Sequence, residues 1–360
     1  MRKERNGNEL VKYIAYFVYK VHMIRTVIIK TPLRLPLGGG GTDLPAYVKE
    51  HGGFIFGASI NKYVYVTVTH SSLFNDVTFS SAHDERNEMK FDPSGLENAL
   101  AREALKLVGL TGGIVISTTS DVPYSTGLGS SGALLVGMLH ALYVLKGENV
   151  TTEFLADRAS HIFFECLGSS EGKQDPYLAS LGGFSCFELD RKNTVAMLPL
   201  TISSATVRDF EARSLYFYTG IQRRSGLLLD EHQKKAAAGN EAVLNYRHRV
   251  KEIGRKIKAA FEQGDLDRFG MLLHDHWQAK KESTHGMSIG AVDALYDRAR
   301  AAGMLGGKIL GAGGGGFFMA FASRGREDGI REIFQAAGLL PSDIRVCRAG
   351  TEVIFDSRNA

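Results

Sequence analysis

Cysteine and proline are scarce in this sequence, and long apolar runs are missing from it. There are 3 cysteines and 8 prolines among 360 residues. The cysteines are far apart and odd in number, which excludes a disulfide framework and a cysteine metal site and favours a reducing cytoplasm. The apolar stretch 14–18 is shorter than the core of a secretion signal. No later segment approaches the roughly 20 apolar residues of a membrane helix, so we expect a cytoplasmic protein with no membrane partner.

An excess of one charge is also missing. Lys and Arg number 43 and Asp and Glu number 39, which gives a net charge of +4, and the basic residues are scattered along the chain. A nucleic-acid-binding surface is therefore not indicated, whereas a small positive balance suits anionic small molecules. A length of 360 residues with 44% hydrophobic content is enough for two domains, each with its own core.

What is present is a mixture of strand-like and helical patterns. About four helices are expected between residues 225 and 302. The other expected helices are at 94–108, 130–145 and 152–167, and the strands are at 24–30, 54–60, 63–69, 113–119, 183–189, 214–219, 305–310 and 317–322.

The domain organisation follows from a polar, irregular stretch at residues 198–207. We expect an N-terminal extension at residues 1–22, a first domain at 23–203 and a second domain at 204–360. An upstream start, with the folded chain beginning near Met23, accounts for the first 22 residues equally well.

The most informative motif is the segment 121–132, DVPYSTGLGSSG, between a predicted strand and a long apolar helix. Glycines let the backbone approach a phosphate closely, and the free N–H groups and positive dipole end of the helix bind it. The two serines could cap the helix, or their hydroxyls could face a phosphate or a Mg²⁺ ion. The residues expected to bind phosphate are Pro123, Gly127, Leu128, Gly129, Ser130, Ser131 and Gly132.

A second glycine loop at residues 311–316 fits the G-x-G-x-x-G pattern of dinucleotide-binding proteins. In those proteins a helix follows the loop, whereas residues 317–322 are short, aromatic and strand-like. We therefore expect a tight hairpin against another backbone or a ligand, with Gly313 and Gly314 near the substrate.

A third loop contains four consecutive glycines at residues 38–41, with Arg34 before them and Thr42 and Asp43 after them. A flexible linker is rarely confined between two predicted strands, so a backbone loop around a ligand is favoured. The pattern G-x-x-x-x-G-K-[ST] is absent from the sequence, and a P-loop is therefore excluded.

The three loops, in this order and spacing over about residues 24–325, resemble the family of galactokinase, homoserine kinase, mevalonate kinase and phosphomevalonate kinase, the GHMP kinases. The segments 34–43, 172–177, 218–225 and 308–316 are most similar to its heptose 7-phosphate kinases. The resemblance implies an α+β fold of two domains, the first like the second domain of ribosomal protein S5 and the second ferredoxin-like. It also implies ATP-dependent phosphorylation of the anomeric hydroxyl of D-glycero-D-manno-heptose 7-phosphate.

The same resemblance assigns roles to residues. Asp175, expected in a loop, would be the catalytic base, and Arg34 would stabilise its ionised form and the developing phosphoryl charge. Without the resemblance Asp175 would be a turn residue and Arg34 a surface residue at a strand end. The sugar would be bound by Gly40, Gly41, Thr42 and Asp43, although Asp43 could also be an ordinary Asx-turn residue.

A magnesium ion bound with ATP is expected on Ser131 and Glu165, because Mg²⁺ prefers a few oxygen ligands and keeps several waters. Glu171 could take the place of Glu165, which could equally be an ordinary solvated acid.

A substrate phosphate needs a cation site, for which Arg223 and Arg224 are the first candidates and Lys173 a further one. The arginine pair could also be solvent-exposed. Near Trp277, expected in the core, His274 and His276 are expected to be exposed and not to bind a metal.

One residue departs from the heptose kinase pattern: Pro176 follows Asp175 where glutamine is common. The sugar contacts near it can therefore differ. The alternatives are a kinase of another sugar, either an unphosphorylated hexose or a different heptose, and a non-catalytic sugar or nucleotide sensor of the same fold. Retention of Arg34 and Asp175 favours an enzyme, working as a monomer or homodimer.

Overall fold

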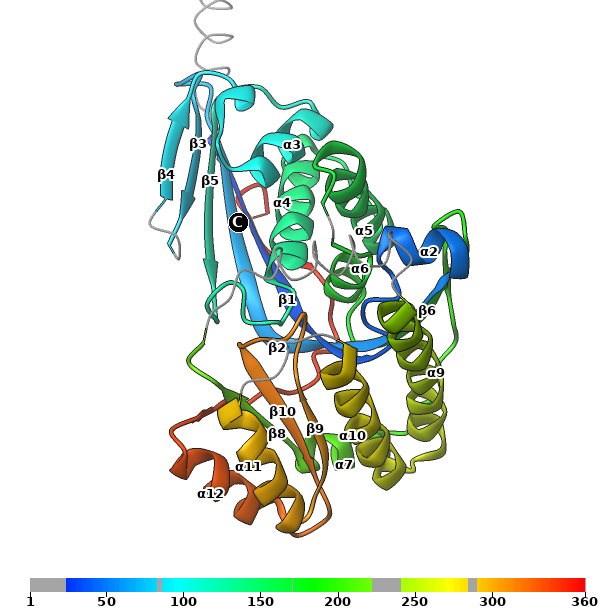
Figure 1. Cartoon of the computed structure of the whole chain (residues 1–360). Helices are drawn as coiled ribbons and strands as arrows, with labels where there is room; N and C mark the ends of the chain where they lie inside the picture. The colour runs from blue at the N-terminus through cyan, green and yellow to red at the C-terminus, as the bar shows by residue number, and fades with distance from the viewer. Residues whose placement is uncertain (1–23, 83–85, 170, 222–240, 284–289, 360) are drawn as a thin grey trace, which may run out of the picture.

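A computed structural model describes residues 24–82, 86–169, 171–221, 241–283 and 290–359. Two sheets organise this part of the chain, one in the upper and one in the lower half of Figure 1. The larger has the strand order β12-β1-β2-β5-β3-β4, with β6 paired to β2 and β7 to β6, and the smaller has the order β11-β8-β10-β9. All pairings are antiparallel except that of β3 with β5.

The strands of the larger sheet are β1 Arg25–Gly38, β2 Gly53–His70, β3 Val77–Ser81, β4 Arg86–Lys90, β5 Ile114–Ser120, β6 Phe184–Leu189, β7 Val195–Met197 and β12 Glu352–Asp356. Those of the smaller sheet are β8 Ser214–Tyr218, β9 Met304–Ile309, β10 Phe317–Ala322 and β11 Leu340–Pro341. The helices are α2 Pro45–His51, α3 Ala99–Val108, α4 Ser130–Lys146, α5 Thr152–His161, α6 Gln174–Leu181, α7 Ser204–Arg213, α9 Glu241–Gln263, α10 Leu266–Ser283, α11 Gly290–Ala301 and α12 Glu327–Ala336, with a 3₁₀ turn at Pro93–Gly95 and a π-helical turn at Ile162–Cys166.

Helix α4 is apolar on nearly every side because it is enclosed on nearly every side. It packs against β1 and β2 of the large sheet and against α3, α5 and α6 (Figure 1). A helix buried all round carries no amphipathic stripe, and this one occupies the centre of the first core. Its N-terminus, at Ser130, points toward the second half of the molecule.

Three expected strands are wrong in their extent. The first strand does not end at residue 30 but continues to Gly38, because Pro32 and Pro36 stand at register shifts in its pairing with β2. A proline lacks the N–H that a regular ladder uses, and an irregular pairing accommodates it. The expected strands 54–60 and 63–69 form the single long strand β2.

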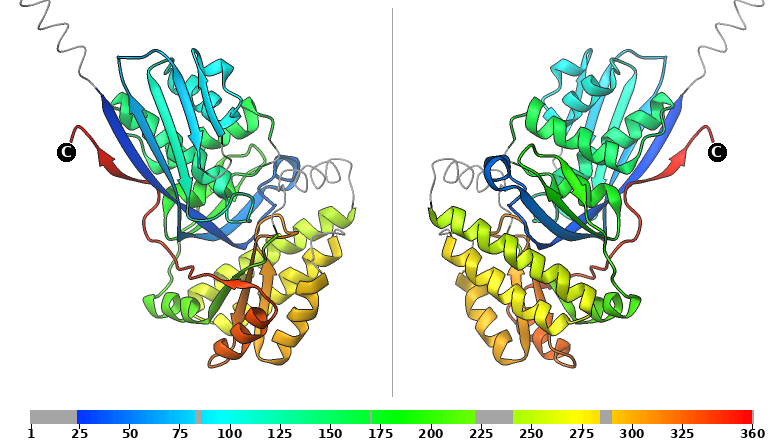
Figure 2. Two further views of the ribbon diagram at one scale, coloured as in Figure 1. Left: turned by 90° about the vertical axis from the view of Figure 1, so that its left-hand side faces the viewer. Right: turned by 90° about the vertical axis from the view of Figure 1, so that its right-hand side faces the viewer.

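A cluster of phenylalanine rings joins the two halves. Phe184 of β6 and Phe261 of α9 have ring centroids 5.3 Å apart, and both lie within 6 Å of Phe210 of α7. Phe269 of α10 and Phe321 of β10 extend the cluster into the second sheet, with centroids 4.8 Å apart. Aromatic burial of this extent fixes the two sheets relative to each other. Figure 2 shows the two halves of the chain from two further sides.

The end of the chain returns to the first sheet. The strand β12 pairs with β1, and Arg25 and Asp356 form a buried ion pair with Nη2 and Oδ2 3.0 Å apart. The expected boundary at residue 203 falls directly before α7, whose first turn Ser203 caps. The last strand of the expected second domain, β12, nevertheless pairs with β1 and belongs to the first sheet. The range 204–360 is therefore not a separate structural unit. Within the described ranges no helix is long and apolar enough to cross a membrane.

Candidate active site

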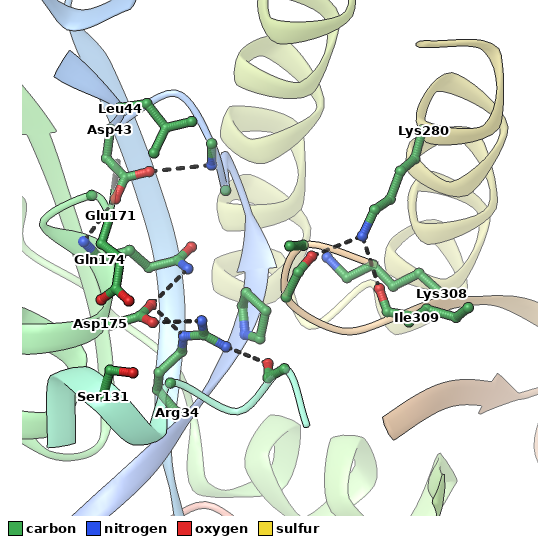
Figure 3. Close-up of a pocket in the computed structure, with 18 of the residues that line it drawn as sticks. Arg34, Asp43, Leu44, Ser131, Glu171, Gln174, Asp175, Lys280, Lys308 and Ile309 are labelled. Carbon is green, nitrogen blue, oxygen red and sulfur yellow. Dashed lines mark hydrogen bonds and ion pairs between the residues drawn. The ribbon is translucent and has the colours of Figure 1, made fainter. Parts of the chain in front are cut away.

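A cavity of about 290 Å³ lies between the two halves, and all three glycine loops reach it. Its first wall comes from the first half of the chain and contains three carboxyl groups (Figure 3). Its second wall comes from α9, α10 and β9 and contains basic groups. The lining residues are Arg34, Pro36, Gly40, Gly41, Asp43, Leu44, Ser125, Thr126, Gly127, Gly129, Ser130, Ser131, Glu171, Gly172, Gln174, Asp175, Tyr246, Arg247, His276, Lys280, Lys308, Ile309, Gly311 and Ala312.

Arg34 and Asp175 form a bidentate ion pair at the first wall. Arg34 Nε donates to Asp175 Oδ1 at 2.6 Å and Nη2 donates to Oδ2 at 2.9 Å. The remaining guanidinium nitrogen, Nη1, donates to the carbonyl oxygen of Gly127 at 2.6 Å. Arg34 is buried within β1, so the expected alternative of a surface arginine at a strand end is wrong. A bidentate pair holds the carboxylate in one orientation.

Asp175 was expected in a loop because of its Gly and Pro neighbours, but it lies in the first turn of α6. Pro176 is compatible with that position because the first N–H groups of a helix have no acceptor inside it. Gln174 Nε2 donates a further hydrogen bond to Asp175 Oδ1 at 3.2 Å. The carboxylate thus lies at the positive end of a short helix, which stabilises negative charge.

Asp43 is held by the backbone of two loops. It accepts hydrogen bonds from the N–H of Gln174 at 2.8 Å and from the N–H of Gly41 at 3.2 Å. Burial, and secondarily the charge of Asp175, raises the pKa of Asp43 above its ordinary value, while these hydrogen bonds oppose the shift. A Cβ at Gly172 would lie 1.9 Å from Asp43 Oδ2, so only glycine fits there.

The loop before α4 brings backbone to both members of the ion pair. The N-cap of α4 is Gly129, with φ of 79°, and no side chain caps the helix, so of the two alternatives for the serines the capping role is wrong. A Cβ on Gly129 would lie 2.9 Å from Arg34 Cγ and 3.2 Å from Asp175 Oδ2. Ser130 and Ser131 line the cavity, and the Oγ of Ser130 is buried with no hydrogen-bond partner among the described residues.

The glycine loop at residues 311–316 packs backbone to backbone against the loop that precedes α4. The N–H of Phe317 donates to the carbonyl oxygen of Thr126 at 3.1 Å, and a Cβ at Gly316 would lie 2.2 Å from that oxygen. A Cβ at Gly127 would lie 2.5 Å from the carbonyl oxygen of Leu310. Strand β10 follows the loop, which confirms the argument against a dinucleotide-binding motif.

Glu171 lies in the cavity and Glu165 does not. The Oε2 atom of Glu171 is buried and has no hydrogen-bond partner within the described residues. Burial, with the charge of Asp175 as a second cause, raises the pKa of Glu171 to about 8. Glu165 is exposed on the π-helical turn, so the structure does not place it with Ser131.

The second wall carries buried basic groups. Lys280 of α10 donates through Nζ to the carbonyl oxygens of Ile309 at 3.1 Å and Gly311 at 2.8 Å. Lys308 of β9 donates through Nζ to the carbonyl oxygen of Leu37 at 3.2 Å. His276, expected to be exposed, is instead 4% exposed, and Trp277 beside it is in the core as expected.

The structure brings only part of the expected site together. Thr42 is fully buried and joins its loop to the backbone of Gly39 and Phe54 rather than lining the cavity. Lys173 lies beside Asp157, with Nζ and Oδ1 3.7 Å apart, outside the cavity lining. Also outside that lining are Pro123, Leu128, Gly132, Gly313 and Gly314, whereas Arg223 and Arg224 lie outside the described residues.

The cavity residues that sequence reasoning missed include Gln174, Arg247, His276, Lys280 and Lys308. Lys308 lies three residues before the glycine run 311–316, and that position was the one available signal for it. Nothing in the pattern of α9 and α10 distinguishes the other basic residues from a solvated helix face.

Comparison with known proteins gives consistent matches across the chain. Residues 97–183 match the model of the GHMP kinases N terminal domain, and residues 257–339 match that of the GHMP kinases C terminal domain. A D-glycero-alpha-D-manno-heptose 7-phosphate kinase of Campylobacter jejuni is 30% identical over 309 residues, which cover 83% of this chain and 90% of that protein.

Solved structures agree in fold. A D-glycero-D-manno-heptose 1-phosphate kinase from Bacteroides thetaiotaomicron has a TM-score of 0.74 at 24% identity and covers 92% of this chain and 99% of its own. A galactokinase from Lactococcus lactis, complexed with galactose, has a TM-score of 0.72 at 19% identity and covers 96% of this chain and 99% of its own. The names of the two heptose kinases differ in the position of the substrate phosphate.

Proposed function

Because this chain belongs to the GHMP kinase family, we propose that it transfers the γ-phosphoryl group of ATP to the anomeric hydroxyl of D-glycero-D-manno-heptose 7-phosphate, giving the 1,7-bisphosphate. Membership makes the chain an ATP-dependent phosphotransferase with an alcohol acceptor, of the sugar kinase type. The finer statement, the heptose and its 7-phosphate, is supported by the relative that is 30% identical over most of both chains.

The observation that carries the reaction is the Arg34–Asp175 pair at the cavity. Phosphoryl transfer requires an oriented acceptor oxygen, neutralisation of the triphosphate and a base for the departing proton. Asp175 is the base, and it takes the proton of the acceptor hydroxyl on a lone pair that its three hydrogen bonds leave free. Arg34 fixes the direction of that lone pair and places positive charge where phosphoryl charge develops.

The other first-wall residues position the two substrates. The backbone of Gly127 and Gly129, with the N-terminus of α4 behind it, binds the nucleotide phosphates. Asp43, with Gly40 and Gly41, binds sugar hydroxyls beside Asp175. The interlocked backbones of the loop before α4 and of the glycine loop at residues 311–316 exclude water from the reacting oxygens.

Magnesium is implied by the chemistry of ATP, and the first wall fits it. Ser131 would supply a hydroxyl and Glu171 a carboxyl oxygen, which is buried with no hydrogen-bond partner among the described residues; these are the hard oxygen ligands that Mg²⁺ prefers. Within the described part of the chain no group of three or more His, Cys, Asp or Glu could hold a metal, so the remaining ligands would come from phosphate and water. The ion would neutralise charge on the triphosphate.

A sugar panel with ATP tests the proposal. Heptose 7-phosphate, heptose 1-phosphate, unphosphorylated heptose and galactose are compared by ADP release, and the product is identified by phosphorus NMR. We expect the highest kcat/KM with heptose 7-phosphate and a new anomeric phosphate signal. Equal turnover of a sugar without the 7-phosphate, or phosphorylation at another carbon, refutes the proposed substrate while leaving the kinase assignment in place.

A further inference from the structure

Three basic side chains of the second wall are buried at the cavity. His276, Lys280 and Lys308 are 4%, 3% and 3% exposed. Burial of charge is costly unless a partner compensates it. Lys308 donates its hydrogen bond to the carbonyl oxygen of Leu37, which is a neutral acceptor.

His276 adds an independent observation. Both ring nitrogens, Nδ1 and Nε2, are buried and have no hydrogen-bond partner among the residues that the structure describes. Buried polar atoms in folded proteins are nearly always hydrogen-bonded, so an orphaned imidazole at a cavity wall points to a ligand group that is able to occupy it. The ring lies on α10, one turn before Lys280.

The basic groups of this cluster lower one another's pKa. Burial lowers the pKa of Lys280 to about 7, and the charge of Arg34 adds to the shift. The pKa of Lys308 is lowered by burial and then by Lys280 and Arg34, and that of His276 by burial and then by Lys308 and Lys280. Mutual repulsion of this kind is relieved when an anion enters.

The two walls of the cavity are therefore different in charge. Asp43, Glu171 and Asp175 lie on the first wall, and Lys280 and Lys308 lie opposite (Figure 3). A sugar whose acceptor hydroxyl meets Asp175 would extend its far end toward the second wall. The nucleotide phosphates have their own site at the N-terminus of α4.

We propose that His276, Lys280 and Lys308 form the binding site for the phosphate monoester that the acceptor sugar already carries. This inference rests on the proposed function and assigns the substrate phosphate to the second wall. It also replaces Lys173, which lies beside Asp157 away from the cavity. Lysine ammonium groups bind phosphate as point charges, and the imidazole donates to or accepts from its oxygens.

The test compares Lys308→Met with the wild type on heptose 7-phosphate and on unphosphorylated heptose, each at saturating ATP. Charge-assisted hydrogen bonds of this type contribute enough for the kcat/KM ratio between the two sugars to fall by about 100-fold. The KM for ATP stays within about twofold, because the nucleotide is bound elsewhere. His276→Gln, which keeps a polar side chain, lowers the same ratio by about tenfold.

Lys281→Met is the matched control. Lys281 is the next residue of α10, and its Nζ lies 3.6 Å from Asp293 Oδ1, outside the cavity lining. This variant loses the same charge and keeps the wild-type ratio. Circular dichroism and thermal melts verify the fold of each variant.

Three outcomes decide the matter. A ratio that Lys308→Met and His276→Gln leave unchanged refutes this inference alone. Equal loss on both sugars with a raised KM for ATP refutes it as well, because the cluster then serves the nucleotide phosphates. A wild-type enzyme that does not prefer the phosphorylated heptose refutes both this inference and the proposed substrate.

Discussion

Arg34 and Asp175, 141 positions apart in the chain, are joined by two parallel hydrogen bonds of 2.6 and 2.9 Å. The third donor of the same guanidinium binds the carbonyl oxygen of Gly127 in the phosphate loop. One side chain from the interior of β1 thus fixes the proposed base and the loop proposed to bind the nucleotide relative to each other. Under the proposed function, strand geometry rather than a mobile loop would set the distance between the acceptor and donor substrates.

Replacing Asp175 by Asn removes the base and keeps the shape. General base catalysis contributes about 10²–10⁴-fold, so we expect kcat to fall by about 10³-fold or more. ATP affinity, measured by calorimetry, stays nearly unchanged because Asp175 does not belong to the phosphate loop. A loss of kcat below about tenfold would remove Asp175 from the role of base.

Replacing Arg34 by Lys keeps the charge and loses the bidentate geometry. An ammonium cannot donate to both oxygens of Asp175 and to Gly127 in the same arrangement. We expect kcat to fall by about 100-fold, with a smaller change in KM for the sugar. Steady-state kinetics on folded protein measure both. Wild-type kcat in Arg34→Lys would show that charge alone suffices there.

A helix or strand was predictable from the sequence where its own residues form a continuous apolar run. The helix at 130–145 and the strand at 317–322 were confirmed nearly to the residue as α4 and β10, because an all-apolar run has few alternatives. Strand continuation through Pro32 and Pro36 was not predictable, since the irregular pairing that accommodates them is a property of β2. The return of β12 to β1 is a long-range pairing without a local signal.

The part of the candidate site that is formed by glycine loops was predictable from the sequence. The glycine loops indicate backbone close to a ligand, and the structure brings all three to one cavity. The second wall was not predictable, because Lys280 and His276 have the spacing of any polar helix face, and only tertiary packing buries them. The sequence alone did not distinguish Glu165 from Glu171 as a candidate metal ligand. The structure shows that Glu165 is exposed, whereas Glu171 lines the cavity and its Oε2 atom is buried.

Gly132→Ala tests how closely α4 supports the catalytic residue. A Cβ there would lie 2.6 Å from Asp175 Cβ and 3.0 Å from the nitrogen of Pro176, so α6 must shift. Overpacking of this kind costs about 1–3 kcal/mol. We expect a lower melting temperature and a kcat reduced by about tenfold or more, because small displacements of a base are costly.

The control for that variant is Gly329→Ala. Gly329 lies in α12, and a Cβ there would meet nothing within 4 Å. Alanine in a helix interior is about 0.5–1 kcal/mol better than glycine, so this variant is expected to be slightly more stable and fully active. If Gly132→Ala behaves in the same way, the close contact between α4 and Asp175 is not needed for activity.

The last prediction concerns Asp356, which holds the returning strand β12 to β1. Its carboxylate accepts hydrogen bonds from Arg25 and Arg358, chiefly that of Arg25, and they lower the pKa of Asp356 well below its usual range. A depressed carboxyl pKa stabilises the fold at pH values above the unfolded pKa of about 4 and ceases to do so as the pH falls toward the folded pKa.

Asp356→Asn is therefore expected to lower the free energy of unfolding at pH 7 by about 1–3 kcal/mol, and the difference from the wild type should shrink below pH 4. Urea unfolding at pH 7, 5 and 3 measures it. Asp343→Asn is the matched control, since Asp343 pairs with Arg345 at 3.0 Å on an exposed surface, where such pairs contribute about 0–1 kcal/mol. A difference between Asp356→Asn and the wild type that is the same at all three pH values would show that β12 is held by its ladder and packing and not by the charge of Asp356.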